Sequence, residues 1–168
     1  MEQSGKQLLL RLLLPLLSEG MRVLDIGCGT GEVLYELVQR YPIRGVGIDP
    51  YLCGRCENKL ELVKLEAEKI QELPGLFDLA YTLMSLHHFE DPLTFFCQMS
   101  TKLTRYGRLI VVDWKKGIRT GVPEKYYSLG EVTEVFSKAG LTSIDYGEEV
   151  FHLYAVASLT LTRGARNQ

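Results

Sequence analysis

The chain has 168 residues, of which 46% are hydrophobic and 24% charged, so length and composition favour a single globular domain over residues 1–168. Nineteen Lys and Arg stand against 21 Asp and Glu, which gives a net charge of −2. This balance leaves no basic field for holding a polyanion, and we therefore expect neither nucleic acid nor a membrane as a partner.

An N-terminal helical segment is predicted over residues 1–20. Its most apolar stretch, residues 8–17, is interrupted by Arg11 and Pro15 and covers about half of the roughly 20 residues that a membrane-crossing helix needs. Residues 18–21 form a poor signal-peptide cleavage site, so we expect a cytoplasmic protein. Apolar residues on every helical face indicate that this segment packs on the core or caps it.

From residue 21 onward, short apolar runs rich in β-branched residues alternate with segments of helical periodicity. This alternation is typical of a parallel sheet with helices on both faces. Within the first half of the chain it predicts strands and helices in the following order: a strand over 21–26, a helix over 32–40, a strand over 43–48, a short helical segment over 51–59, and strands over 61–65 and 77–83.

The second half begins with Asp91 and Pro92, a pair that starts a helix because Asp caps free amides and Pro fits the first turn. Its predicted buried stripe consists of Leu93, Phe96, Cys97, Ser100 and Leu103.

The remaining elements complete the sheet. Residues 107–114 form a continuous apolar strand that we expect in mid-sheet. Ser128 and Glu131 form a capping box for a helix that ends at Gly140. Strands over 141–146 and 151–161 follow, and their connection is too short for a parallel crossover. The sequence thus predicts an α/β fold with seven strands, mostly parallel, and an antiparallel C-terminal strand.

A glycine-rich turn over residues 25–32, DIGCGTGE, connects the first strand to a helix and lets a ligand approach the backbone closely. The dinucleotide fingerprint needs its third glycine at position 32, where this chain has Glu32. Asp25 and Glu32 oppose a pyrophosphate but favour a ligand that carries an ammonium and a sulfonium. Asp49 lies 22 residues after Gly27, where an acid can accept both hydroxyls of a ribose.

These residues resemble the class I S-adenosylmethionine-dependent methyltransferases. Residues 23–31 resemble the first motif of that family, and residues 45–50 resemble its ribose-binding second strand. Residues 77–92 resemble the fourth-strand motif of its small-molecule branch. Residues 103–110 resemble the turn into the fifth strand, although Arg-Tyr-Gly replaces the usual Pro-Gly-Gly. The resemblance covers residues 21 to about 161, and it implies a Rossmann-like fold and S-adenosyl-L-methionine as cofactor, with S-adenosyl-L-homocysteine as product.

The resemblance also implies roles for individual residues. The loop glycines would wrap the methionine portion, and an acid at the end of each of the first two strands would hold the ammonium and the ribose. Alternatively, the loop is a packing turn, and the acids are helix caps or solvated charges. The residues implied in cofactor binding are Asp25, Gly27, Cys28, Gly29, Gly31, Asp49, Pro50, Tyr51, Ala67, Glu68 and Leu83.

His87 and His88 follow the strand over 77–83, where ligands of open α/β sheets bind, and they are the candidate catalytic residues. An imidazole can take a proton from a methyl acceptor near neutral pH, although the pair can equally serve packing and capping. Cys53 and Cys56 are spaced like a redox dithiol but lack the required strand–helix context. We therefore expect ordinary thiols and no metal site.

The leading hypothesis is a methyltransferase that acts on an unidentified small molecule, as a monomer or homodimer. One alternative is a non-catalytic protein that binds S-adenosylmethionine. The other is an NAD(P)-dependent oxidoreductase, which Glu32 in place of the third glycine disfavours.

Overall fold

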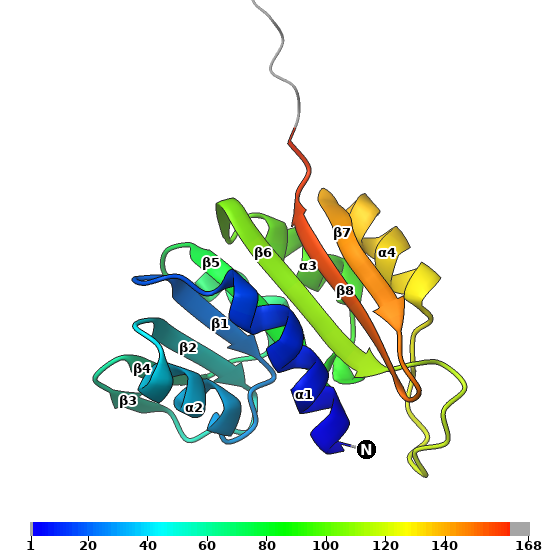
Figure 1. Cartoon of the computed structure of the whole chain (residues 1–168), viewed down its shortest axis with the longest axis horizontal. Helices are drawn as coiled ribbons and strands as arrows, with labels where there is room; N and C mark the ends of the chain where they lie inside the picture. Colours follow the sequence, from blue (N-terminus) through cyan, green and yellow to red (C-terminus); the bar gives the residue numbers. More distant parts are fainter. Residues whose placement is uncertain (1, 162–168) are drawn as a thin grey trace, which may run out of the picture.

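The computed structural model describes residues 2–161, with side chains from residue 4 onward. One eight-stranded sheet runs through it in the order β3-β4-β2-β1-β5-β6-β8-β7 (Figure 1). Its strands are β1 (Arg22–Ile26), β2 (Arg44–Asp49), β3 (Arg55–Glu57), β4 (Leu60–Lys64), β5 (Phe77–Leu83), β6 (Leu103–Trp114), β7 (Leu141–Glu148) and β8 (His152–Leu159). The helices are α1 (Glu2–Leu13), α2 (Glu32–Arg40), α3 (Pro92–Ser100) and α4 (Leu129–Lys138), and short 3-10 helices are η1 (Leu14–Leu16), η2 (Ala67–Glu72) and η3 (Leu86–His88).

The predicted α/β, Rossmann-like architecture is confirmed. Strands β4, β2, β1, β5 and β6 are mutually parallel, whereas β8 runs antiparallel to both β6 and β7. The strand order reverses at β1, which lies between β2 and β5. In open α/β sheets this reversal opens a crevice at the carboxyl ends of the strands, where ligands bind.

The eighth strand replaces a predicted helix. Residues 51–59 are not helical, because Arg55–Glu57 instead pairs antiparallel with β4. The hairpin turns at Asn58, whose φ of 34° lies in the left-handed region that asparagine tolerates better than most residues. This hairpin was not predicted from the sequence, because its turn lacks the Asn-Gly signature.

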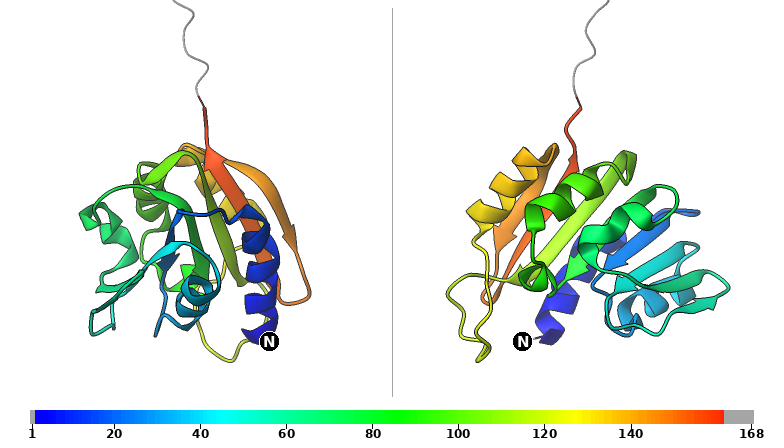
Figure 2. Two further views of the ribbon diagram at one scale, coloured as in Figure 1. Left: turned by 60° about the vertical axis from the view of Figure 1, so that its left-hand side comes forward. Right: turned by 180° about the vertical axis from the view of Figure 1, so that it is seen from behind.

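Helices cover both faces of the sheet (Figure 2). On one face, α1 and α2 pack with Tyr81 and Ile110; on the other, η2, α3 and α4 pack with Ala80 and Val111. Leu9 of α1 is fully buried, so the N-terminal helix contributes to the core. Within residues 2–161, no helix has the length and apolar character needed to cross a bilayer.

The predicted buried stripe of α3 is correct at Phe96 but wrong at Leu93 and Cys97, and Leu103, which is buried as predicted, belongs to β6. Leu93 is 41% exposed and Cys97 is exposed, whereas Phe95, Phe96 and Met99 are buried. The helix turns these rings toward η2 and α4, where Phe96 packs edge to face on Phe136 at a centroid distance of 4.9 Å. Aromatic rings bury more apolar area than Leu93 and Cys97 would, and they decide which face of α3 points inward.

Candidate cofactor and catalytic site

The glycine loop begins directly after β1. The amides of Gly27 and Cys28 donate to the carbonyl of Ile48 at 2.8 and 2.9 Å, which ties the loop to the end of β2. Gly27 has a φ of +72°, and a Cβ there would lie 2.5 Å from Ser85. Only glycine permits this close approach between the ends of β1 and β5. At Gly29, by contrast, a Cβ would meet nothing within 4 Å, so the space above the loop is open.

Asp49, at the end of β2, holds the glycine loop from the other side. Its Oδ2 accepts a hydrogen bond from the Gly29 amide at 3.1 Å, and its Oδ1 accepts one from the Tyr51 amide at 2.9 Å. Carboxylate oxygens have two lone-pair sites each, so Asp49 keeps acceptor capacity toward a ligand. This arrangement fixes the carboxylate at the rim of a cavity.

That cavity, the larger of two at this edge of the sheet, has a volume of about 820 Å³. Glu68 lines this cavity together with Glu90 and Asp91. The Oε1 atom of Glu68 accepts hydrogen bonds from the amides of those two residues at 2.9 and 3.3 Å. Tyr51 is 91% exposed at the rim, so its ring is available to a ligand. Six residues predicted to bind the cofactor line this cavity: Gly27, Asp49, Pro50, Tyr51, Ala67 and Glu68.

Asp25 lies beneath the loop rather than in the wall of this cavity. It is 4% exposed, and its Oδ2 accepts a hydrogen bond from the Tyr81 hydroxyl at 2.8 Å. Burial raises the pKa of Asp25 to about 7; the Tyr81 hydrogen bond opposes this shift, and the charge of Asp49 adds to it. A cationic group placed at this carboxylate would favour its charged form and so lower the pKa of Asp25 again.

Cys28, Gly29 and Gly31 also lie outside the wall of the larger cavity. Burial, reinforced by the charges of Asp25 and Asp49, raises the pKa of the Cys28 thiol, so this cysteine stays protonated and is no nucleophile. All four cysteines of the chain are free of disulfides.

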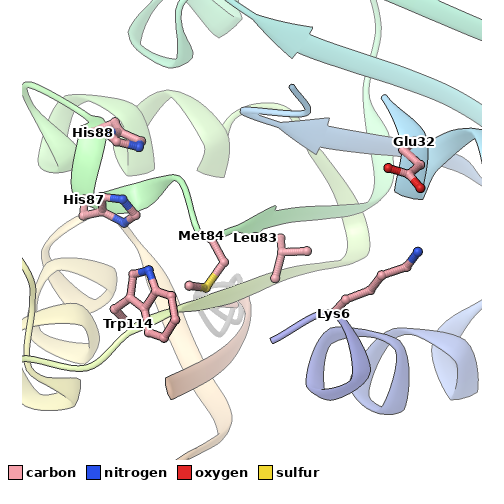
Figure 3. A pocket seen from close by; sticks show the side chains of 7 residues that line it. All are labelled: Lys6, Glu32, Leu83, Met84, His87, His88 and Trp114. Atoms are coloured by element: carbon pink, nitrogen blue, oxygen red, sulfur yellow. The ribbon is translucent and has the colours of Figure 1, made fainter. Parts of the chain in front are cut away.

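A smaller cavity of about 450 Å³ adjoins the first (Figure 3). His88 lines both cavities, whereas His87 lines only the smaller one. Met84, directly after β5, has a backbone φ of 54°. This left-handed conformation is unfavourable for a residue with a side chain, and the surrounding structure maintains it. The lining residues are Lys6 of α1, Glu32 of α2, Leu83, Met84, His87, His88 and Trp114.

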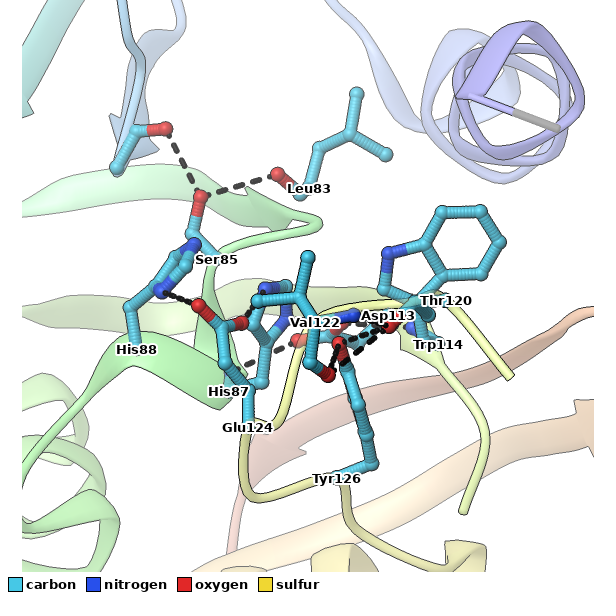
Figure 4. Close-up of polar contacts among 11 residues, drawn as sticks. Leu83, Ser85, His87, His88, Asp113, Trp114, Thr120, Val122, Glu124 and Tyr126 are labelled. Atoms are coloured by element: carbon cyan, nitrogen blue, oxygen red, sulfur yellow. Dashed lines mark hydrogen bonds and ion pairs between the residues drawn. The ribbon is translucent and has the colours of Figure 1, made fainter. Parts of the chain in front are cut away.

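Four polar side chains interact between the cavities (Figure 4). The Nδ1 of His87 lies 2.6 Å from Asp113 Oδ1, and its Nε2 lies 3.0 Å from Glu124 Oε2. The second oxygen of Glu124 lies 3.3 Å from His88 Nδ1. The His87 side chain is 6% exposed and that of His88 is 58% exposed. His87 is thus a fixed, buried group, while His88 faces the cavities.

Neither carboxylate of this cluster was predicted from the sequence. Asp113 interrupts the apolar run of β6 and is buried, and a charged residue in such a run is a signal that sequence reasoning can use. Glu124 belongs to the connection over residues 115–128, and its local sequence carries no signal, because only the fold brings it to the histidines.

The chain is similar in sequence to enzymes named tRNA U34 carboxymethyltransferase. The chain is 31% identical over 100 residues to the tRNA U34 carboxymethyltransferase of Actinobacillus succinogenes, an alignment that covers 53% of this chain and 31% of the relative. The chain thus spans about a third of the length of these relatives. They contradict our expectation that nucleic acid plays no part. A net charge is a sum over the whole chain, and it does not exclude local recognition of an RNA base.

Solved structures share the fold. An S-adenosylmethionine-dependent methyltransferase from Aquifex aeolicus matches with a TM-score of 0.73 and 22% identity, covering 95% of this chain and 98% of that one. The 1,6-didemethyltoxoflavin-N1-methyltransferase of Burkholderia thailandensis, solved with S-adenosylhomocysteine, matches with a TM-score of 0.70 and 18% identity over 95% of this chain and 78% of that one. A family model described as "Methyltransferase domain" matches residues 2–146. The chain therefore belongs to the methyltransferase domain family.

Proposed function

We propose that the chain is one S-adenosylmethionine-dependent methyltransferase domain that uses the larger cavity for the cofactor and the smaller one for the methyl acceptor. The observation that carries this proposal is the juxtaposition of the glycine loop with Asp25 and Asp49 at the carboxyl ends of β1 and β2. A sulfonium ligand with an ammonium and a ribose fits these two acids, whereas a pyrophosphate does not.

S-adenosylmethionine supplies an electrophilic methyl group. On the protein side, Asp25 meets the ammonium, and the loop around Gly27, Gly29 and Gly31 accommodates the methionine portion. Asp49 accepts the ribose hydroxyls, while Tyr51 and Glu68 flank the adenine at the rim. The cavity lining supports this assignment for Gly27, Asp49, Tyr51 and Glu68, and the open space over Gly29 supports it for the loop. Pro50, Ala67, Cys28 and Leu83 complete the proposed set through backbone and apolar contacts.

Methyl transfer forms a bond between the acceptor lone pair and the methyl carbon while the carbon–sulfur bond breaks, leaving its electron pair on sulfur. Positioning and exclusion of water supply most of the rate. His87 and His88 are the proposed catalytic residues because they stand between the cavities, where the acceptor proton must leave. Asp113 orients His87, and Glu124 must move from Nε2 before that nitrogen can meet an acceptor.

The histidines are tested by separate alanine variants. If one of them takes the acceptor proton, its alanine variant loses roughly 100-fold in turnover or more while cofactor affinity is kept, because base catalysis contributes about this much. If both variants keep wild-type turnover, the histidines have no part in the chemistry, and the reaction rests on alignment alone.

Two acceptor classes have specific support. A small molecule is the first, because the smaller cavity of about 450 Å³ fits a metabolite and has a mixed polar and apolar lining. A tRNA base is the second, because the relatives carry that substrate in their names. The connection over residues 115–128 also contains four basic residues, Lys115, Lys116, Arg119 and Lys125, of which Lys115 and Lys116 are paired with Glu148 and Glu131.

The proposed function is tested by incubating the protein with methyl-labelled S-adenosylmethionine and either a low-mass metabolite fraction or total tRNA. We expect label in one of the two fractions, and we expect Asp49→Ala to reduce the transfer at limiting S-adenosylmethionine. Cofactor binding without transfer to either fraction would support a non-catalytic binding protein instead. Absence of both binding and transfer would overturn the proposal.

A further inference from the structure

The cluster of His87, His88 and Glu124 has the composition of a metal site. Each side chain offers one ligand atom, and these atoms all lie within 4.8 Å of one another. Two histidines come from η3, and the carboxylate comes from the connection that follows β6, so tertiary structure rather than local sequence assembles the set. Two imidazoles and a carboxylate are a ligand set that holds catalytic zinc, with a further position left open.

The ligand atoms of the cluster lie close to coordination distance from one another. Zinc–nitrogen and zinc–oxygen bonds of about 2.0–2.1 Å at angles of about 90–110° place neighbouring ligand atoms about 2.9–3.4 Å apart. In the structure, His87 Nε2 lies 3.0 Å from one oxygen of Glu124, His88 Nδ1 lies 3.3 Å from the other, and one ligand atom of each residue lies within 4.8 Å of the other two. Side-chain movements that draw these atoms together would let them surround a cation.

Asp113 supplies a second observation. It is buried, and its carboxylate accepts hydrogen bonds from the backbone amides of His87 and Trp114 at 3.0 and 2.7 Å. The same carboxylate contacts His87 Nδ1 at 2.6 Å. A carboxylate behind a histidine fixes the ring so that the opposite nitrogen presents a lone pair to a metal. Here that opposite nitrogen, Nε2, is the one directed at Glu124.

The charge of the cluster and its position beside the cavities also suit a cation. Two neutral imidazoles, Glu124 and the neighbouring Asp113 carry two negative charges, which a divalent cation balances. The exposed His88 lines both cavities, and Glu124 lines the larger one. An ion held by these residues would therefore lie beside both cavities.

We propose that His87 Nε2, His88 Nδ1 and Glu124 bind a divalent transition-metal ion of the zinc class, with Asp113 as the outer carboxylate that orients His87. The inference deepens the proposed function and rests on it for the role of the site. With the cation bound, the histidine nitrogens would be ligands and would not take the acceptor proton themselves; the cation would instead stabilise the anion of an acceptor oxygen or sulfur, whose proton would pass to water.

The experiment measures metal binding directly, without an acceptor. Because exposed thiols also bind zinc, the full chain is used with Cys53→Ser, Cys56→Ser and Cys97→Ser. Calorimetric titration with Zn²⁺ is expected to show one ion per chain, and Mg²⁺ is expected not to bind, because imidazole ligands favour zinc. In this background, His88→Ala and Glu124→Gln are expected to abolish stoichiometric binding, and circular dichroism checks that both variants fold.

Two further variants sharpen the result. Asp113→Asn should weaken Zn²⁺ binding about 10- to 100-fold, the effect typical of an outer-shell partner. Glu134→Gln, which removes an exposed carboxylate paired with Lys138 on α4, should bind Zn²⁺ as the parent does. The inference is overturned if the parent binds no stoichiometric Zn²⁺, or if His88→Ala and Glu124→Gln leave binding unchanged. S-adenosylmethionine is titrated into the same samples, so failure of the metal site is distinguished from failure of the proposed function.

Discussion

Replacing the buried carboxylate of Asp25 should make the stability of the protein less dependent on pH between about pH 5 and pH 8. The pKa of Asp25 is raised from 3.8 to about 7 in the folded protein, mainly by burial. Between these two values the folded state keeps a proton that the unfolded state releases, so the free energy of unfolding falls as pH rises. The contribution of Asp25 is complete below the unfolded pKa and is lost as pH rises through about 7.

The size of the effect follows from the same interval. Each pH unit between the two pKa values costs about 1.36 kcal/mol, so the loss between about pH 5 and pH 7 is about 2.7 kcal/mol. Asp25→Asn cannot ionise and escapes this loss, while its amide oxygen still accepts the Tyr81 hydroxyl. The variant also buries an amide group at a cost that is the same at both pH values, so that cost cancels in the comparison.

The assay is urea unfolding of wild type and Asp25→Asn at about pH 5 and pH 8. The difference in unfolding free energy, variant minus wild type, should increase by about 2–3 kcal/mol from the lower to the higher pH. Asp25→Asn should also lose affinity for S-adenosylmethionine, because the ammonium of the cofactor no longer meets a negative charge at residue 25. A stability difference that is equal at both pH values would refute the argument from burial.

Three further predictions concern the loop and one helix. Asp49→Ala should weaken S-adenosylmethionine binding by about 1.5–3 kcal/mol, the worth of hydrogen bonds to a charged group; calorimetry on the folded variant checks this, and unchanged affinity would remove Asp49 from the site. Gly27→Ala should lower the melting temperature more than Gly20→Ala, because both have positive φ but only the first places a Cβ 2.5 Å from Ser85; equal losses would contradict the close approach. Ser128→Ala should cost about 0.5–2 kcal/mol in urea unfolding through loss of the capping box, and no loss would show that the cap is dispensable.

Patterns confined to a few neighbouring residues predicted the fold well. The helix over 32–40 and the strand over 77–83 have the predicted bounds, because amphipathic periodicity and a continuous apolar run are local signals. The capping box of α4 is present as predicted. The face of α3 was misjudged because its orientation depends on how Phe96 and Phe136 pack across two helices, and sequence periodicity alone does not contain that contact.

The candidate site likewise contains residues that the sequence predicted and residues that only the fold brings together. Asp49 and the glycine loop were recognisable because they follow consecutive parallel strands, whose carboxyl ends meet by topology. Tyr81 was not predicted as a partner of Asp25. The two residues are opposite each other on β1 and β5, and this pairing becomes known only with the register of the sheet. Glu124 reaches the histidines through an irregular connection, and no propensity or spacing rule predicts the path of such a segment.

The central claim, that the loop and its two acids form a site for S-adenosylmethionine, is tested most directly by calorimetric titration of the purified chain. We predict one molecule of S-adenosylmethionine bound per chain, with S-adenosylhomocysteine as a competitor and no heat of binding from NAD or NADP. A folded protein that binds a nicotinamide cofactor and gives no heat with S-adenosylmethionine would contradict the account.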